Sequence, residues 1–152
     1  MIRAEVGGGA VAISFTQFRG NRAFFTNVII RENQARVGGA IHSQFNVHTG
    51  DQGVPRLEFD GTLIEPSLTF VNTTFLRNNA SEGGSIYFDG IPALFQGVSL
   101  QENTAVESGG GLYIFGGSVI RVFDGTFLAN SASCGGALDI HEFSMLHCIE
   151  CV

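Results

Sequence analysis

Short apolar runs of three to six residues recur along the whole chain, separated by Gly, Asn or small polar residues. One kind of run follows a Gly-Gly pair, as in 85–88 and 111–115, and the other kind precedes an Asn, as in 70–75. These runs are rich in aromatic and β-branched residues and are too short for helices. The pattern therefore predicts an all-β protein built from many short strands.

The apolar runs belong to one repeated phrase. It consists of an apolar residue, two spacers, Asn, one spacer and Ala, followed by Gly-Gly, a small residue and an aliphatic residue. The Gly-Gly pairs begin at Gly8, Gly38, Gly83, Gly109 and Gly135. Their spacing indicates a unit of about 26 residues, with one extra insertion of about 19 residues. Self-similarity at such a period predicts a solenoid.

A unit of this length without a helix fits one coil of a parallel β-helix. We therefore expect a single β-helix domain over residues 1–152, with four to five coils. A loop insertion is expected at about 44–67, and a Cys-containing tail at 143–152. Equivalent residues would stack about 4.8 Å apart. An inward, hydrogen-bonded ladder would then form at one turn from the four repeated asparagines, Asn33, Asn78, Asn103 and Asn130.

Side chains alternate along a strand, so residues one and three positions after the inward aliphatic position face solvent. The first outward column is His42, Tyr87, Tyr113 and Asp139. The second is Gln44, Asp89, Phe115 and His141. Aromatic and polar side chains gathered on one face indicate a shallow contact surface for carbohydrate or protein. The alternative is that they are ordinary outward strand residues, chosen for β-propensity.

The net charge of the chain and the length of its apolar runs exclude several classes of partner. The formal net charge is −6 and no basic block exists, so nucleic-acid binding is not expected. No apolar run approaches about 18 residues, so no transmembrane segment is expected. No cofactor or metal site is predicted. The candidates for disulfides are Cys134, Cys148 and Cys151, because one CxxC spacing without a second is a poor zinc signature.

Many β-helices act on polysaccharides, so catalysis is an alternative. Hydrolysis needs two carboxylates about 5 to 9.5 Å apart. Asp89 and Asp139 are expected two coils apart, at roughly 10 Å, without a third acid beside them. The chain has no Lys to act as the base of a lyase. A polysaccharide lyase or hydrolase is therefore the second alternative.

Two motifs, F-x-x-N and G-G-A-[ILV], connect the chain to a known family. The first occurs in full at 75–78 and 127–130, and the second at 8–11, 38–41 and 135–138. Copies at 83–86 and 109–112 depart by one small residue. Together they resemble the repeats of the chlamydial polymorphic outer membrane protein family. The resemblance implies a right-handed β-helix from the passenger region of a surface-displayed adhesin or autotransporter, whose motifs are scaffold motifs.

The expected function is thus a non-enzymatic scaffold, extracellular or on the cell surface, that binds a protein or carbohydrate ligand and belongs to a larger protein. No capping helix is evident at either end of the repeats. Open strand edges need a cover, either from flanking sequence or from another chain. The first alternative is therefore a docking subunit held among neighbouring subunits of an assembly, for instance in the lumen of an organelle.

Overall fold

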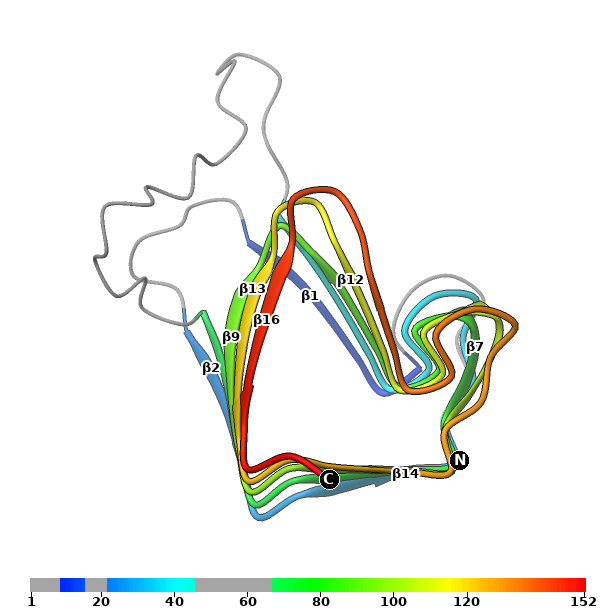
Figure 1. Cartoon of the computed structure of the whole chain (residues 1–152), viewed down its shortest axis with the longest axis horizontal. Helices are drawn as coiled ribbons and strands as arrows, with labels where there is room; N and C mark the ends of the chain where they lie inside the picture. The colour runs from blue at the N-terminus through cyan, green and yellow to red at the C-terminus, as the bar shows by residue number, and fades with distance from the viewer. Residues whose placement is uncertain (1–8, 16–21, 46–66) are drawn as a thin grey trace.

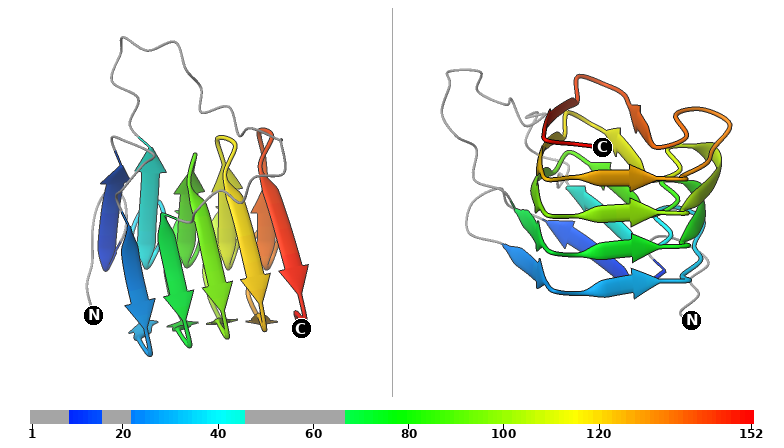
Figure 2. Two further views of the ribbon diagram at one scale, coloured as in Figure 1. Left: turned by 90° about the vertical axis from the view of Figure 1, so that its left-hand side faces the viewer. Right: turned by 60° about the horizontal axis from the view of Figure 1, so that its bottom comes forward.

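The chain folds into a parallel β-solenoid with a three-sided cross-section (Figure 1). The computed structural model describes residues 9–15, 22–45 and 67–152, and these ranges contain strands but no helix. The strands of successive coils lie side by side and form flat sheets along the solenoid axis (Figure 2). The chain turns counterclockwise in Figure 1 as it advances toward the viewer, so the solenoid is right-handed. The predicted fold class is confirmed.

Three long sheets and one short sheet make up the sides. Sheet 1 contains β1 (Val11–Phe15), β4 (Ile41–Phe45), β8 (Ile86–Asp89), β12 (Leu112–Phe115) and β15 (Leu138–Ile140). Sheet 2 contains β2 (Ala23–Thr26), β5 (Leu68–Val71), β9 (Pro92–Gln96), β13 (Val119–Phe123) and β16 (Met145–Ile149). Sheet 3 contains β3 (Ile29–Arg31), β6 (Thr74–Leu76), β10 (Ser99–Gln101) and β14 (Thr126–Leu128). The short sheet contains β7 (Asn79–Glu82) and β11 (Thr104–Ser108).

Two boundaries differ from the sequence-based expectation. Strand β4 continues to Phe45, so Gln44 belongs to sheet 1 and not to the insertion. The rest of the expected insertion, 46–66, lies outside the described residues, as does Gly8 of the first Gly-Gly pair. Residues 143–152, expected as a tail, include β16, which pairs with β13 as part of a further coil.

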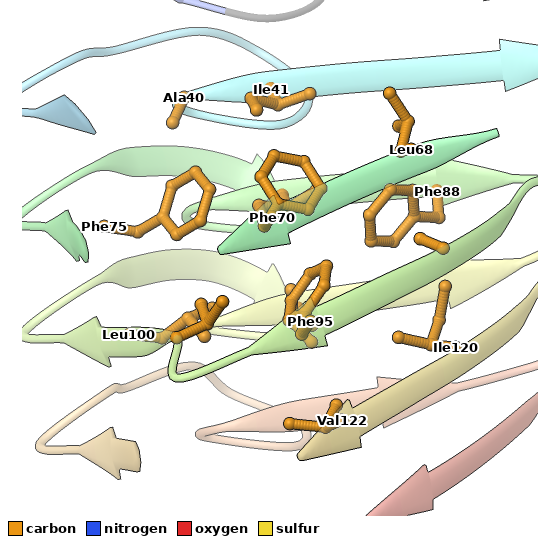
Figure 3. Close-up of a cluster of buried hydrophobic side chains, with 14 of the residues drawn as sticks. Ala40, Ile41, Leu68, Phe70, Phe75, Phe88, Phe95, Leu100, Ile120 and Val122 are labelled. Carbon is orange, nitrogen blue, oxygen red and sulfur yellow. The ribbon is translucent and has the colours of Figure 1, made fainter. Parts of the chain in front are cut away.

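The space between the sheets is filled by apolar columns, one residue from each coil (Figure 3). Phe70, Phe75, Phe88 and Phe95 are fully buried. The ring of Phe70 lies 4.9 Å from that of Phe95 and 5.6 Å from that of Phe75, measured between centroids. Each such side chain contributes about 1.5–3 kcal/mol of hydrophobic stabilisation. The apolar runs of the sequence thus become a continuous core, because each coil completes the core of its neighbour.

A buried asparagine ladder closes the corner between sheet 3 and the short sheet. The Nδ2 groups of Asn33, Asn78 and Asn103 each donate to the Oδ1 of the ladder asparagine in the following coil, at 3.0 Å in every case. Each of these Oδ1 atoms also accepts from the backbone N–H of the preceding ladder residue. The Nδ2 groups of Asn78, Asn103 and Asn130 also donate back to a backbone carbonyl of the preceding coil, on Ile30, Phe75 and Leu100 respectively. The ladder therefore satisfies backbone groups that the turn would otherwise bury without partners.

The two glycines of each Gly-Gly pair have different roles. The first, such as Gly83 with φ of 60°, adopts the left-handed conformation that favours glycine. The second, such as Gly84, packs against backbone of the next coil, where a Cβ would overlap the carbonyl oxygen of Gly110. Turn geometry requires the first glycine, and coil-to-coil contact requires the second.

The disulfide joins Cys148 in β16 to Cys151, three residues later, where the chain turns from sheet 2 toward sheet 3. Cys148 continues the inward column of sheet 2, since it pairs with buried Val122. Cys134 is a free and exposed cysteine. The disulfide therefore fixes the corner of the last described coil.

The residue before each ladder asparagine adopts the left-handed backbone conformation, and this conformation leads to a stability prediction. The position is occupied by Glu32, Arg77, Glu102 and Ala129, with φ between 52° and 55°. Ala129→Gly should therefore stabilise the fold by about 0.5–1 kcal/mol, because glycine adopts this conformation without strain. The same change at Ala132, which has ordinary φ, should lower stability. Urea unfolding of the two variants tests this, and stabilisation by both or by neither would contradict the explanation.

Candidate binding face

The outward side of sheet 1 gathers the polar and aromatic residues that the alternation predicts to face solvent. Strand pairing places His42 beside Tyr87, Tyr87 beside Tyr113, and Tyr113 beside Asp139. In the second column Gln44 pairs with Asp89, and Asp89 with Phe115. His141 follows the end of β15 and donates its backbone N–H to Ile114. We call the aromatic face the eight residues His42, Gln44, Tyr87, Asp89, Tyr113, Phe115, Asp139 and His141.

The rings of this face form a continuous stack along the solenoid axis. The centroids of Tyr87 and Tyr113 are 5.1 Å apart with an interplanar angle of 13°. His141 stacks on Tyr113 at 5.3 Å and 27°, and Phe115 lies 6.2 Å from Tyr113. His42 meets Tyr87 edge-on at 5.2 Å. For His42, Tyr87 and Tyr113 the spacing follows from the coil repeat of about 4.8 Å, which brings equivalent side chains into ring contact.

Side-chain polar contacts hold both ends of the stack. His141 Nε2 lies 2.9 Å from Asp139 Oδ1, which orients the imidazole ring over Tyr113. At the other end, the His42 side chain is hydrogen-bonded to Gln44. Burial nevertheless lowers the pKa of His42, and the bond to Gln44 offsets this only in part, so the ring is neutral at physiological pH.

The electrostatics of the face come from burial and from four nearby carboxylates. Burial and then Asp89 and Glu82 raise the pKa of the Tyr87 phenol. Burial and then Glu82, Asp139 and Glu142 raise the pKa of Tyr113. The pKa of Asp89 is itself raised, by burial and by Glu142. Both tyrosines therefore keep their protons at neutral pH, within a negative field.

Burial and, to a smaller extent, this field predict a late ionisation of Tyr87 and Tyr113. They are the only two tyrosines in the chain, which has no tryptophan. In the folded protein the phenolate absorbance should appear well above pH 10, whereas in urea the midpoint should return to about 10. The unfolded chain would lose its phenol protons first, so stability should fall as pH rises above about 10. An ordinary midpoint in the folded protein would show that the tyrosines are solvated and not stacked.

Strand alternation in the sequence predicted the ring residues of the aromatic face, but it did not predict two acids near it, Glu82 and Glu142. Glu82 ends β7 beside the Gly-Gly turn, and Glu142 follows His141 in the turn after β15. Both influence Tyr87 and Tyr113, although neither occupies an outward position of sheet 1. Their closeness depends on how the corners fold, and strand alternation does not describe corners. The position of Glu142 next to His141 was the one local signal for it.

The outward groups of this face can contact a ligand. Asp89 and Asp139 lie in different outward columns, two coils apart. Within the described ranges, no cluster of three or more His, Cys, Asp or Glu side chains is arranged to hold a metal ion. The groups directed outward are phenol hydroxyls, imidazoles, a phenyl ring and carboxylates. This set can bind through hydrogen bonds, charge and apolar contact.

Comparison with known proteins gives no family assignment. No protein-family model matches the chain, and no curated protein or solved structure matches it either. In the part of the chain that the structure describes, no helix is long and apolar enough to cross a membrane.

Proposed function

We propose that the protein is a non-enzymatic binding scaffold, extracellular or on the cell surface, in which the solenoid presents the aromatic face to a macromolecular ligand. The resemblance of its repeats to those of the chlamydial polymorphic outer membrane proteins supports this role. The observation that carries the proposal is the ring stack, which spans β4, β8, β12 and the end of β15 on one solvent-facing side. Stacked aromatic side chains on a rigid sheet suit recognition, because little conformational entropy is lost on binding.

Two further features support details of this proposal. A disulfide between Cys148 and Cys151 is typical of an oxidising compartment, as found outside the cell. The rings of Tyr87 and Tyr113 face each other, and the His141 ring also stacks on Tyr113. A sugar ring needs an open aromatic face for stacking, so this arrangement favours a protein ligand over a carbohydrate.

An array of extracellular proteins, peptides and glycans tests the proposal. The wild-type protein is compared with the double variant Tyr87→Ala/Tyr113→Ala, and with Thr74→Ala/Ser99→Ala on the outward side of sheet 3. Binding to one class of array component should be lost only in the tyrosine variant, while circular dichroism shows that all three proteins are folded. Equal binding by both variants, or no binding by the wild type, would refute the proposal.

One observation favours a second function, that of a docking subunit. The last coil exposes side chains of the inward columns: Ile140 is 41% exposed, whereas its neighbour Ile114 in the preceding coil is fully buried. Leu138 and Leu146 are half-buried for the same reason. This edge accepts a further coil of the same kind, from this polypeptide or from another one.

Sedimentation at increasing concentration tests docking between copies. Ile140→Asp should abolish any association, whereas Leu128→Asp, which alters an outward residue of the same coil that is 58% exposed, should leave it intact. A monomer at every concentration, with no partner retained during purification from the source, would remove this second candidate.

A further inference from the structure

We infer that the partner of the aromatic face is a cationic polypeptide, bound as an extended segment through arginine side chains. This inference rests on the proposed function and names the chemistry of its ligand. The inference is based on the charges around the ring stack and on the groups of the stack that face outward.

Apart from the two histidines, the ionisable side chains that give the face its charge are all carboxylates. Asp89 and Asp139 lie on its strands, and Glu82 and Glu142 border Tyr87 and Tyr113. The strands β4, β8, β12 and β15 contain no Arg, and the chain has no Lys. The whole protein carries a net charge of −6, so long-range attraction also favours a basic partner.

The orientation of the rings determines what a ligand meets. The faces of Tyr87 and Tyr113 are turned toward neighbouring rings, which leaves the ring edges and the carboxylates of Asp89 and Asp139 for a ligand. The carboxylate oxygens accept hydrogen bonds. A guanidinium group presents five donors in a planar fork that matches a carboxylate, which makes arginine a better fit than lysine. A neutral ligand would desolvate the carboxylates without pairing their charge.

The spacing of the acids fits an extended segment. Asp89 on β8 and Asp139 on β15 are separated by one intervening strand, β12, about 10 Å across the strands, and by two residues, about 7 Å, along them, so they lie roughly 12 Å apart. Side chains on one side of an extended peptide recur every ~7 Å, and the long arginine side chain covers the difference. Two arginines separated by a single residue can therefore reach both aspartates.

Tyrosine fluorescence measures this binding directly. Tyr87 and Tyr113 are the only tyrosines and tryptophan is absent, so the emission of the protein originates within the face itself. A hexa-arginine peptide should change the emission saturably, and added salt should weaken its binding. A hexa-lysine peptide of equal charge should bind several-fold more weakly.

Matched charge variants separate a specific site from general attraction. Asp89→Asn/Asp139→Asn should raise the Kd for hexa-arginine at least about tenfold, because each loses a charge-assisted pair. Glu32→Gln/Glu102→Gln removes the same charge at exposed corner positions beside the ladder, and should leave the Kd nearly unchanged. Circular dichroism confirms that each variant is folded. Glu142→Gln, in an exposed turn, gives an independent test, and its expected loss of affinity for hexa-arginine is smaller.

The possible outcomes are distinguishable. Equal weakening by both double variants, or no response to hexa-arginine, would overturn the inference of a cationic partner. If a neutral oligosaccharide or a neutral peptide changes the emission instead, the proposed binding function stands and only this inference fails. If Tyr87→Ala/Tyr113→Ala binds its array ligand as well as the wild type does, the proposed function fails as well.

Discussion

Replacement of Gly84 by alanine is expected to destabilise the solenoid by at least about 3 kcal/mol, enough to prevent folding of a marginal coil stack. The added Cβ would overlap the carbonyl oxygen of Gly110 and lie 2.5 Å from that of Thr104. Both atoms belong to the backbone of the next coil. They cannot move away without breaking the bond from the Gly84 N–H to Gly109, which is 2.9 Å long.

Gly117→Ala is the matched control for this prediction. Gly117 has a φ of 75°, but nothing lies within 4 Å of its missing Cβ. Alanine there should cost only the strain of the left-handed conformation, about 1–2 kcal/mol. Thermal unfolding of both variants, followed by circular dichroism, gives the comparison. A smaller loss at Gly84 than at Gly117 would mean that the coils are not packed through their glycines.

Asn78→Ala is expected to cost about 2–4 kcal/mol, since it leaves several buried groups without partners. The Oδ1 of Asn78 accepts from both the backbone N–H and the Nδ2 of Asn33, and its Nδ2 donates to the carbonyl of Ile30. Asn78 is fully buried and Asn33 is 5% exposed, so water cannot replace these bonds without opening the corner. The loss should appear as a lower free energy of unfolding in urea.

The neighbouring Asn79 provides the control, because it is the same residue type one position away. Its side chain is half-buried, and the bonds that join it to Asn33 and Ala35 are made by its backbone. Asn79→Ala should therefore change stability by less than about 0.5 kcal/mol. An equal loss of unfolding free energy in Asn78→Ala and Asn79→Ala would show that the hydrogen bonds of the ladder do not stabilise the fold more than other contacts do.

The candidate site was only partly predictable from the sequence. Alternation along short strands brings His42, Tyr87, Tyr113 and Asp139 to one side, because the repeat keeps the register from coil to coil. Alternation does not describe how the rings turn. The stacking of Tyr87 on Tyr113 depends on side-chain rotamers in a given sheet twist, and it decides that the faces of the two rings are turned toward each other.

The repeat by itself determines the coil, the inward columns and the position of the asparagines, since a period of about 26 residues without a helix leaves few ways to bury its apolar runs. Only the tertiary structure decides what happens at the corners. There Glu82 and Glu142 approach the tyrosines, and Cys148 bonds Cys151 while Cys134 stays free. The physical reason is that strands follow a period of two, whereas corners depend on individual left-handed residues and on contacts between coils that no local pattern encodes.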